Sequence, residues 1–173
     1  AYMESDGTPG DVNMDGIINI LDVIVIINMI LGVEDENAMA DLNGDGSINI
    51  QDIILVINII LGPRTDNASS AQLFDTGSKM KMKSNGYIGG VQMTLRHDTD
   101  FSIKLTDKAM EVSDYRTVGN ETILVIVAPQ SDELFTYSGD FEIVDLIVAS
   151  GDARVNVSFP IEFRLNSAYP NPF

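Results

Sequence analysis

Residues 10–32 read GDVNMDGIINILDVIVIINMILG, and residues 40–62 read ADLNGDGSINIQDIILVINIILG. When the two stretches are aligned at an offset of 30 residues, 14 of the 23 positions are identical, which is far above chance. A repeat at a fixed spacing indicates a structural unit that is used twice. The short connector at residues 33–39 joins the two copies.

Each copy opens with a polar loop of twelve residues in which oxygen-bearing side chains recur at a fixed spacing. Positions 1, 3, 5, 9 and 12 are Asp or Asn, position 6 is the Gly that permits a sharp turn, and position 7 offers its backbone carbonyl. The expected ligands are Asp11, Asn13, Asp15, Ile17, Asn19 and Asp22 in the first loop, and Asp41, Asn43, Asp45, Ser47, Asn49 and Asp52 in the second. Ca²⁺ prefers about six to eight such oxygens, whereas the octahedral geometry of Mg²⁺ fits these loops poorly. We therefore expect two calcium ions, and two Asn/Asp/Gly-rich turns without an ion are the alternative.

An Ile-rich segment follows each loop and ends in Leu-Gly. The β-branched Ile and Val in these segments favour a strand when they are taken alone. The loop pattern requires a helix behind it, however, and Gly32 and Gly62 are typical stops at a helix C-terminus, with Pro63 directly after the second. We therefore predict helices over residues 20–31 and 50–61.

The chain changes character after Gly62. The sequence PRTDNASS at residues 63–70 is typical of a linker. Apolar and polar residues then alternate at 91–96 and 101–105, as they do in a half-buried strand. Further strands are expected at residues 111–118, 122–128, 141–149, 154–159 and 161–165. About eight short strands separated by polar turns predict an antiparallel β-sandwich.

The composition restricts the function. The 173 residues include 26 acidic and 10 basic side chains, one His and no Cys; the formal net charge is −16, although 45% of the residues are hydrophobic. A disordered acidic tail would lack this apolar content, a nucleic-acid binder needs basic surface, and cysteine chemistry is excluded. Residues 1–63 hold 11 acidic and no basic side chains, so this part carries −11 and the remainder −5. Two calcium ions would bring the net charge from −16 to −12.

The two loops follow the pattern D-x-N-x-D-G-x-I-N-x-x-D, and each is followed by one helix without a helix before it. Over about residues 10–62 this arrangement closely resembles the type I dockerin module. The resemblance implies a non-catalytic docking module that binds a β-sandwich called cohesin, usually on an extracellular scaffold. The family's contact positions fall on Ile20, Leu21, Ile27, Asn28, Ile50, Gln51, Ile57 and Asn58. The hydroxyl and basic residues familiar at these positions are missing, which argues against a conventional cellulosomal partner.

The helices themselves indicate a binding surface. Residues 23–27 and 53–57 are apolar on all sides, whereas a surface helix normally keeps a polar face. Two short helices can bury one stripe against each other, and a second apolar stripe left exposed would mark a binding site. The alternative is that the β-region of the same chain covers this stripe.

The β-region is weakly similar to cohesin-like sandwiches over about residues 71–160. The similarity lies in the run GGVQMTL at 89–95, the strand at 122–128 and the segment GDFEI at 139–143. Docking and receptor surfaces on one subunit would form a heterologous contact, which closes into rings or propagates as a filament. Lys79, Lys81 and Lys83 alternate with Met80 and Met82 and predict a cationic stripe on one strand. The stripe either docks the acidic module or protects an edge strand.

Two further segments bear on location and catalysis. Phe163-Arg164-Leu165 and YPNPF at 169–173 resemble the opening of the C-terminal sorting region of type IX secretion substrates, which implies export to the surface of a Gram-negative bacterium. His97 beside Asp98 is expected to lie at a strand end and not to be catalytic. The sequence has no serine elbow, phosphate-binding glycine loop or zinc motif, so no enzyme is expected.

The predicted fold class is α+β with two modules. A small all-α duplication of calcium loop and helix spans residues 1–62, a linker spans 63–70, and an antiparallel β-sandwich of cohesin-like or immunoglobulin-like type spans 71–165, before a tail at 166–173. We expect a non-catalytic, calcium-stabilised extracellular assembly protein whose dockerin-like module docks on the β-sandwich of a neighbouring copy, giving a filament or tubule. The alternatives are a docking module of a larger secreted enzyme that binds a separate cohesin-type scaffold, and pairing of the two modules within one monomer. Neither a nucleic-acid partner nor membrane insertion is expected.

Overall fold

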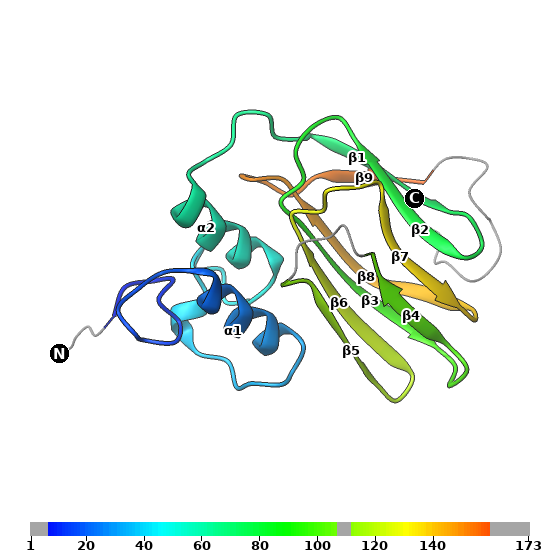
Figure 1. Cartoon of the computed structure of the whole chain (residues 1–173), viewed down its shortest axis with the longest axis horizontal. Helices are drawn as coiled ribbons and strands as arrows, with labels where there is room; N and C mark the ends of the chain where they lie inside the picture. Colours follow the sequence, from blue (N-terminus) through cyan, green and yellow to red (C-terminus); the bar gives the residue numbers. More distant parts are fainter. Residues whose placement is uncertain (1–6, 107–111, 160–173) are drawn as a thin grey trace.

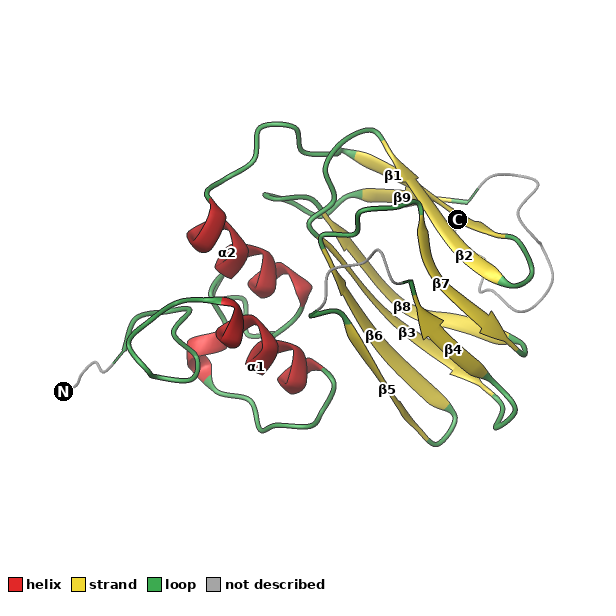
Figure 2. Cartoon of the chain, in the orientation of Figure 1, coloured by secondary structure: helices red, strands yellow, loops and turns green. Residues whose placement is uncertain are grey.

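The computed structural model describes residues 7–106 and 112–159. Two helices pack against one end of a β-sandwich that is built from two sheets (Figures 1 and 2). The predicted α+β fold is therefore confirmed. No helix within the described ranges is long and apolar enough to cross a membrane.

The two predicted helices form behind the two loops. Helix α1 spans Ile20–Ile30 and α2 spans Ile50–Leu61, with a short 3₁₀-helix, η1, at Ala38–Ala40 between them. Asn19 and Asn49 cap the helix N-termini, and Asp22 and Asp52 complete a capping box in each. Reciprocal capping satisfies N–H groups that the first turn cannot pair, so the loop motif also fixes the helix start. This local signal outweighs the strand preference of the Ile-rich segments.

The strands form a five-stranded sheet in the order β4-β7-β2-β1-β9 and a four-stranded sheet in the order β5-β6-β3-β8. Their bounds are β1 Ser70–Asp75, β2 Lys79–Ser84, β3 Gly90–His97, β4 Ser102–Leu105, β5 Asp114–Val118, β6 Glu121–Val127, β7 Glu133–Ser138, β8 Phe141–Ala149 and β9 Asn156–Ser158. The predicted sandwich is confirmed, but β1 and β7 were not anticipated as strands. One pair departs from the antiparallel pattern, because β9 runs parallel to β1, with Ser70 opposite Asn156. The strand expected at residues 161–165 lies outside the described residues.

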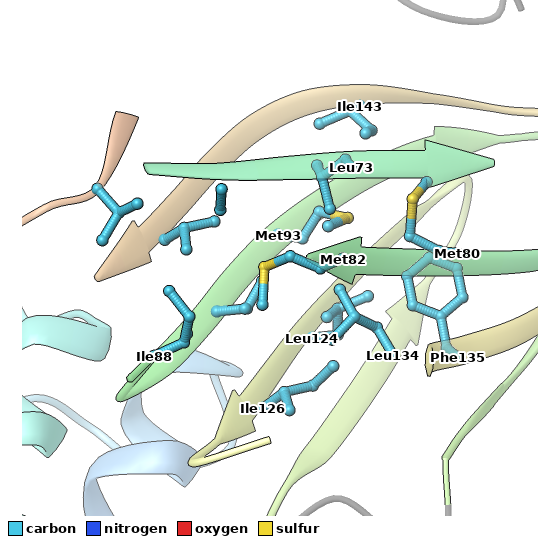
Figure 3. Close-up of a cluster of buried hydrophobic side chains, with 14 of the residues drawn as sticks. Leu73, Met80, Met82, Ile88, Met93, Leu124, Ile126, Leu134, Phe135 and Ile143 are labelled. Atoms are coloured by element: carbon cyan, nitrogen blue, oxygen red, sulfur yellow. The ribbon is translucent and has the colours of Figure 1, made fainter. Parts of the chain in front are cut away.

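The main core lies between the two sheets. Figure 3 shows methionines and aliphatic side chains from both sheets meeting there, among them Met80 and Met82 of β2, Met93 of β3 and Leu124 of β6. The lysines that alternate with Met80 and Met82 therefore point away from this core.

A second buried cluster joins the helices to the four-stranded sheet. On β6, Leu124 and Ile126 face the sandwich core, whereas Val125 and Val127 belong to the cluster that contains the helix residues. Ile147 of β8 also belongs to this second cluster. This end of the sheet is thus buried on both faces, which explains the nearly continuous apolar run in β6.

Candidate metal loops and docking interface

The first loop is closed by hydrogen bonds from its own backbone to its carboxylates. Asp11 accepts a hydrogen bond from the N–H of Gly16 (2.9 Å). Asp22 accepts hydrogen bonds from the N–H groups of Asn13 (3.1 Å) and Asn19 (2.9 Å). Both carboxylate residues are buried. Gly16 has a φ of 88°, so the sharp turn at loop position 6 uses a backbone conformation that favours glycine.

The second loop repeats this arrangement thirty residues later. The Asp41 carboxylate accepts from the N–H of Gly46 (2.9 Å), and Asp52 accepts from the N–H groups of Asn43 (3.3 Å) and Asn49 (2.9 Å). Asp52 is fully buried at the start of α2. The two copies thus share their local geometry as well as their sequence.

One carboxylate oxygen of the second loop lacks a hydrogen-bond partner. Oδ1 of Asp41 is buried, and no described residue donates to it. Burial raises the pKa of Asp52, and the negative charges of Asp41 and Asp45 add to that rise, although two backbone N–H groups lower it. A cation would pair the buried oxygen and offset the repulsion among the carboxylates. These residues therefore fit a calcium ion.

The donor set is mixed. Across residues 7–106 and 112–159, no three acidic or histidine side chains gather into a metal cluster on their own. Each loop combines carboxylates with Asn amide oxygens and with the backbone carbonyl at position 7, contributed by Ile17 or Ser47. Ca²⁺ accepts all three kinds of oxygen, whereas first-row transition metals favour imidazole or thiolate ligands.

Helix α2 lies on the outer face of the four-stranded sheet, where two adjacent glycines make room for it. A Cβ added to Gly90 would lie 2.5 Å from the side chain of Ile50, and one added to Gly89 would lie 3.0 Å from Ile54. Ile50 and Ile54 are 0% and 4% exposed. The side chains of Ile50 and Ile54 therefore occupy space that a side chain at these two positions would need.

Polar contacts fix the position of α2 on the sheet. Oε1 of Gln92 accepts a hydrogen bond from the backbone N–H of Ile50 (2.9 Å), one of the N–H groups that a helix N-terminus leaves unpaired. Near the other end of the helix, the side-chain amide of Asn58 donates to the carbonyl of Gly151 (2.8 Å). The contact between helix and sheet is thus specific as well as apolar.

Two arginines of the sandwich reach the helices. Nε of Arg154 donates to Oε1 of Gln51 (2.7 Å), and a guanidinium nitrogen of Arg116 on β5 donates to the carbonyl of Leu31 (3.0 Å). Leu31 is the C-cap of α1, where a positive charge also interacts favourably with the helix dipole. Both repeats are therefore attached to the sandwich, but only α2 lies on it.

The two repeats present equivalent faces that differ in exposure. Ile20 and Ile24 of α1 correspond to Ile50 and Ile54 of α2 at the offset of 30. The α1 residues are 38% and 39% exposed, whereas the α2 residues are buried against the sheet. One face of the duplication is thus covered within the chain, and its counterpart is open.

The other predicted contact residues fall into separate groups. Leu21 is 51% exposed and extends the open face of α1. Ile27 and Ile57 are buried in the cluster between the helices and the sheet, so neither belongs to an open surface. The side chain of Asn28 donates to Glu34 (3.2 Å) in the connector.

The predicted cationic stripe lies elsewhere. Lys79, Lys81 and Lys83 are on β2 in the five-stranded sheet, whereas the helices cover the four-stranded sheet. The alternative of a lysine-protected edge strand is wrong, because β2 pairs with β1 on one side and with β7 on the other.

Packing and hydrogen bonds hold the ring of His97 in place. Its ring is buried, stacks on Phe101 with centroids 4.3 Å apart, and has one nitrogen 2.7 Å from the carbonyl of Asp98 and the other 2.8 Å from the hydroxyl of Thr122. Both nitrogens are thus engaged in hydrogen bonds at the end of a strand.

The sequence reasoning missed the residues that receive α2. Gly89 and Gly90 had a detectable signal, because glycines at the start of a strand often mark the close approach of another backbone or side chain. Gln92 and Arg116 had none, since an isolated polar residue on a strand does not reveal its partner.

The two loop–helix units with capped helix starts occupy residues 10–61. Residues 9–61 match the dockerin type I domain. The predicted dockerin module is therefore confirmed, and residues 9–61 are called the dockerin segment below. Dockerin type I domains are generally calcium-binding and are themselves non-catalytic modules, and they are typically extracellular.

A cohesin is among the solved structures that are similar to this chain. It is a non-cellulosomal cohesin from the hyperthermophilic archaeon Archaeoglobus fulgidus, with a TM-score of 0.36 and 15% sequence identity, and the match covers 55% of this chain and 86% of that one. No curated protein matches the chain. The predicted sorting motif at residues 169–173 lies outside the described residues.

Proposed function

We propose that this protein is a non-catalytic, calcium-stabilised docking component of an extracellular assembly. Each loop of the dockerin segment would hold one Ca²⁺ through the ligands predicted above. The ion would neutralise part of the charge of three carboxylates per loop and fix the start of the following helix. The buried unpaired oxygen of Asp41 and the raised pKa of Asp52 support this assignment for the second loop.

The difference in exposure between the two repeats carries the proposal. The α2 face is used within the chain, where Ile50 and Ile54 fill the space above Gly90 and Gly89. The equivalent face of α1 offers Ile20, Leu21 and Ile24 at 38%, 51% and 39% exposure. An open apolar patch on the repeat of a helix that already packs on a sheet favours a second docking event of the same kind. The partner would be another β-sandwich, either of a cohesin-type scaffold or of a further copy of this chain.

Pairing within the chain restricts how a filament could form. In each copy the outer face of the four-stranded sheet is already covered by α2, so a neighbouring dockerin segment meets a sheet face that is occupied. A polymer of this chain would therefore need either exchange of α2 between copies or another surface of the sandwich. Export to the surface of a Gram-negative bacterium remains part of the proposal through the resemblance at residues 169–173.

The test is binding of the full chain to a panel of purified cohesin-type domains, measured by calorimetry with calcium and with EDTA. Leu21→Asp should remove the interaction, because it places a charge on the open face. Val118→Asp is the matched control, since Val118 is 61% exposed at the tip of the β5–β6 hairpin and does not belong to the open face of α1. Equal binding by the Leu21→Asp variant and the parent protein would refute docking through α1.

A further inference from the structure

The outer face of the five-stranded sheet gathers four of the five lysines of the chain. Residues directly opposite each other on neighbouring strands point to the same side, and Lys104, Thr136 and Lys79 form one such row across β4, β7 and β2. Lys81 and Lys83 continue along β2 on the same side, because the intervening Met80 and Met82 are buried. We call Lys79, Lys81, Lys83 and Lys104 the lysine face.

The charge of this face is largely unpaired. Lys79 forms an ion pair with Glu133 at 3.2 Å, and Glu133 also lies opposite Lys81 in the pairing of β7 with β2. Lys81, Lys83 and Lys104 form no ion pair with any residue in the described part of the chain. By contrast, the arginines Arg64 and Arg96 are paired with carboxylates, and Arg116 and Arg154 bind the helices. The excess positive charge is therefore concentrated on one side of one sheet.

Fold stability does not explain this concentration. The strand that carries three of the lysines lies inside its sheet, so the lysines do not protect an edge. Like charges on the same face of a strand repel each other. A chain with a net charge of −16 also has no need of lysines for solubility. An anionic partner does explain the arrangement.

The dockerin segment supplies an anionic surface of the required kind. Residues 7–62 contain nine Asp or Glu and no Lys or Arg. Six of the nine belong to the proposed calcium loops, where two ions would reduce their charge from −6 to −2. The other three, Glu34, Asp35 and Glu36, are consecutive and exposed in the connector between the repeats. The connector keeps its −3 charge whether or not calcium is bound.

The connector and the lysine face of one molecule cannot meet. The connector lies beside the C-terminal end of α1, below the helices, whereas β2 lies on the far sheet of the sandwich (Figure 2). We propose that the lysine face binds the acidic connector of a second copy of this chain, so that copies associate head to tail. Two different surfaces on each subunit form a heterologous contact, which continues as a filament unless it closes into a ring.

This inference rests on the proposed function only because both place the chain in an assembly. The lysine face is the sandwich surface that such an assembly would use. The test is sedimentation velocity of the full chain over a concentration series with calcium present. We expect association at low ionic strength that weakens by about tenfold or more when the salt rises to about 0.5 M, because screening shortens the reach of exposed charges.

Charge reversal identifies the two surfaces. The variant Lys81→Glu/Lys83→Glu/Lys104→Glu retains both residues of the Lys79–Glu133 pair and should be monomeric. The variant Glu34→Lys/Asp35→Lys/Glu36→Lys should also be monomeric. A chain that carries all six substitutions restores opposite charges between copies and should associate again, which shows that loss in the single sets is not due to misfolding.

Three results would overturn the proposal. In the first, the parent protein stays monomeric at high concentration and low salt. In the second, the variant with all six substitutions stays monomeric. In the third, the variant with the three lysine substitutions associates like the parent. Binding of dextran sulfate through the lysines by a protein that does not self-associate would assign the face to a polyanion instead. Leu21→Asp should leave head-to-tail association unchanged, so this proposal and docking through α1 fail separately.

Discussion

Ile50, the first residue of α2, packs directly onto Gly90 of β3, and its backbone N–H is bound 2.9 Å away by Gln92 of the same strand. The residue before it, Asn49, is both the helix cap and a predicted calcium ligand. The last part of the second loop, the start of α2 and the docking contact therefore share neighbouring residues. A change at any of these points should reach the others.

The first prediction concerns the space above Gly90. Gly90→Ala should destabilise the docked state by about 1–3 kcal/mol, because the new methyl group overlaps the Ile50 side chain. The effect is steric, since the φ of Gly90 is not in the left-handed region. Urea denaturation of the full chain measures the loss, and hydrogen exchange of α2 locates it. Adding Ile50→Ala to Gly90→Ala should cost less than the two single changes together, by about 0.5–3 kcal/mol, and strict additivity would contradict the contact.

The second prediction concerns the metal. EDTA should lower the melting temperature of the full chain, since a ligand present at about 100 times its dissociation constant stabilises the folded state by about 2.7 kcal/mol. Asp11→Ala and Asp41→Ala should each remove part of the calcium dependence. The Asp41 change should also increase hydrogen exchange in α2, because its loop leads directly into the docked helix.

Asp35→Ala is the control for the calcium experiment, because it removes an exposed carboxylate from the connector and not from a loop. Its calcium-dependent shift in melting temperature should equal that of the parent protein. An equal shift for the Asp11 and Asp41 variants as well would contradict the assignment of the loops.

The third prediction concerns Arg116. Its guanidinium donates to the carbonyl of Leu31 at the end of α1, and Arg116→Ala should cost about 1–2 kcal/mol, as the loss of a charge-assisted hydrogen bond to a helix terminus does. Arg96→Ala is the matched control, because its ion pairs with Glu121 and Glu142 are exposed and long, at 3.9 Å and 3.6 Å. That change should cost less than about 1 kcal/mol. Denaturant unfolding of the two variants under the same conditions measures both losses of stability, and equal losses would contradict the role of Arg116.

Much of this architecture could be predicted because its signals are local. The loop spacing places Asn49 and Asp52 where they cap α2, and this decides between helix and strand for the Ile-rich segment. The alternation in β3 and the apolar run in β8 likewise depend only on neighbouring residues. The parallel pairing of β9 with β1 and the central position of β2 depend on contacts between distant segments, so the sequence alone did not reveal them.

The choice of the docked helix was also beyond the sequence. Ile50 and Ile20 are the same residue, and so are Ile54 and Ile24, so the two faces look equivalent. The structure distinguishes them through the sheet, where the glycines of β3 and the side chain of Gln92 receive α2. The connection after Gly62 also places α2 next to the sandwich, because the segment beyond it is held by Ala68, whose N–H donates to the backbone carbonyl of Tyr87 (3.0 Å).

The last prediction uses this equivalence as its own control. Ile54→Asp and Ile24→Asp are the same change at corresponding positions of the two repeats. Ile54 is 4% exposed against the sheet, so the aspartate would be buried without a partner, and we expect a loss of stability of about 3 kcal/mol or more together with release of α2. Ile24 is 39% exposed, so Ile24→Asp should change stability by less than about 1 kcal/mol.

In binding experiments, the two variants should also behave differently from each other. Ile24→Asp should abolish the interaction with a cohesin-type domain while the chain stays folded. Ile54→Asp should expose the outer face of the four-stranded sheet and so permit a dockerin segment from another copy to reach it. Denaturation and calorimetry on both proteins give the two readouts. If the two substitutions had the same effect on stability, α2 would not be the docked helix, because the asymmetry in burial would then have no energetic consequence.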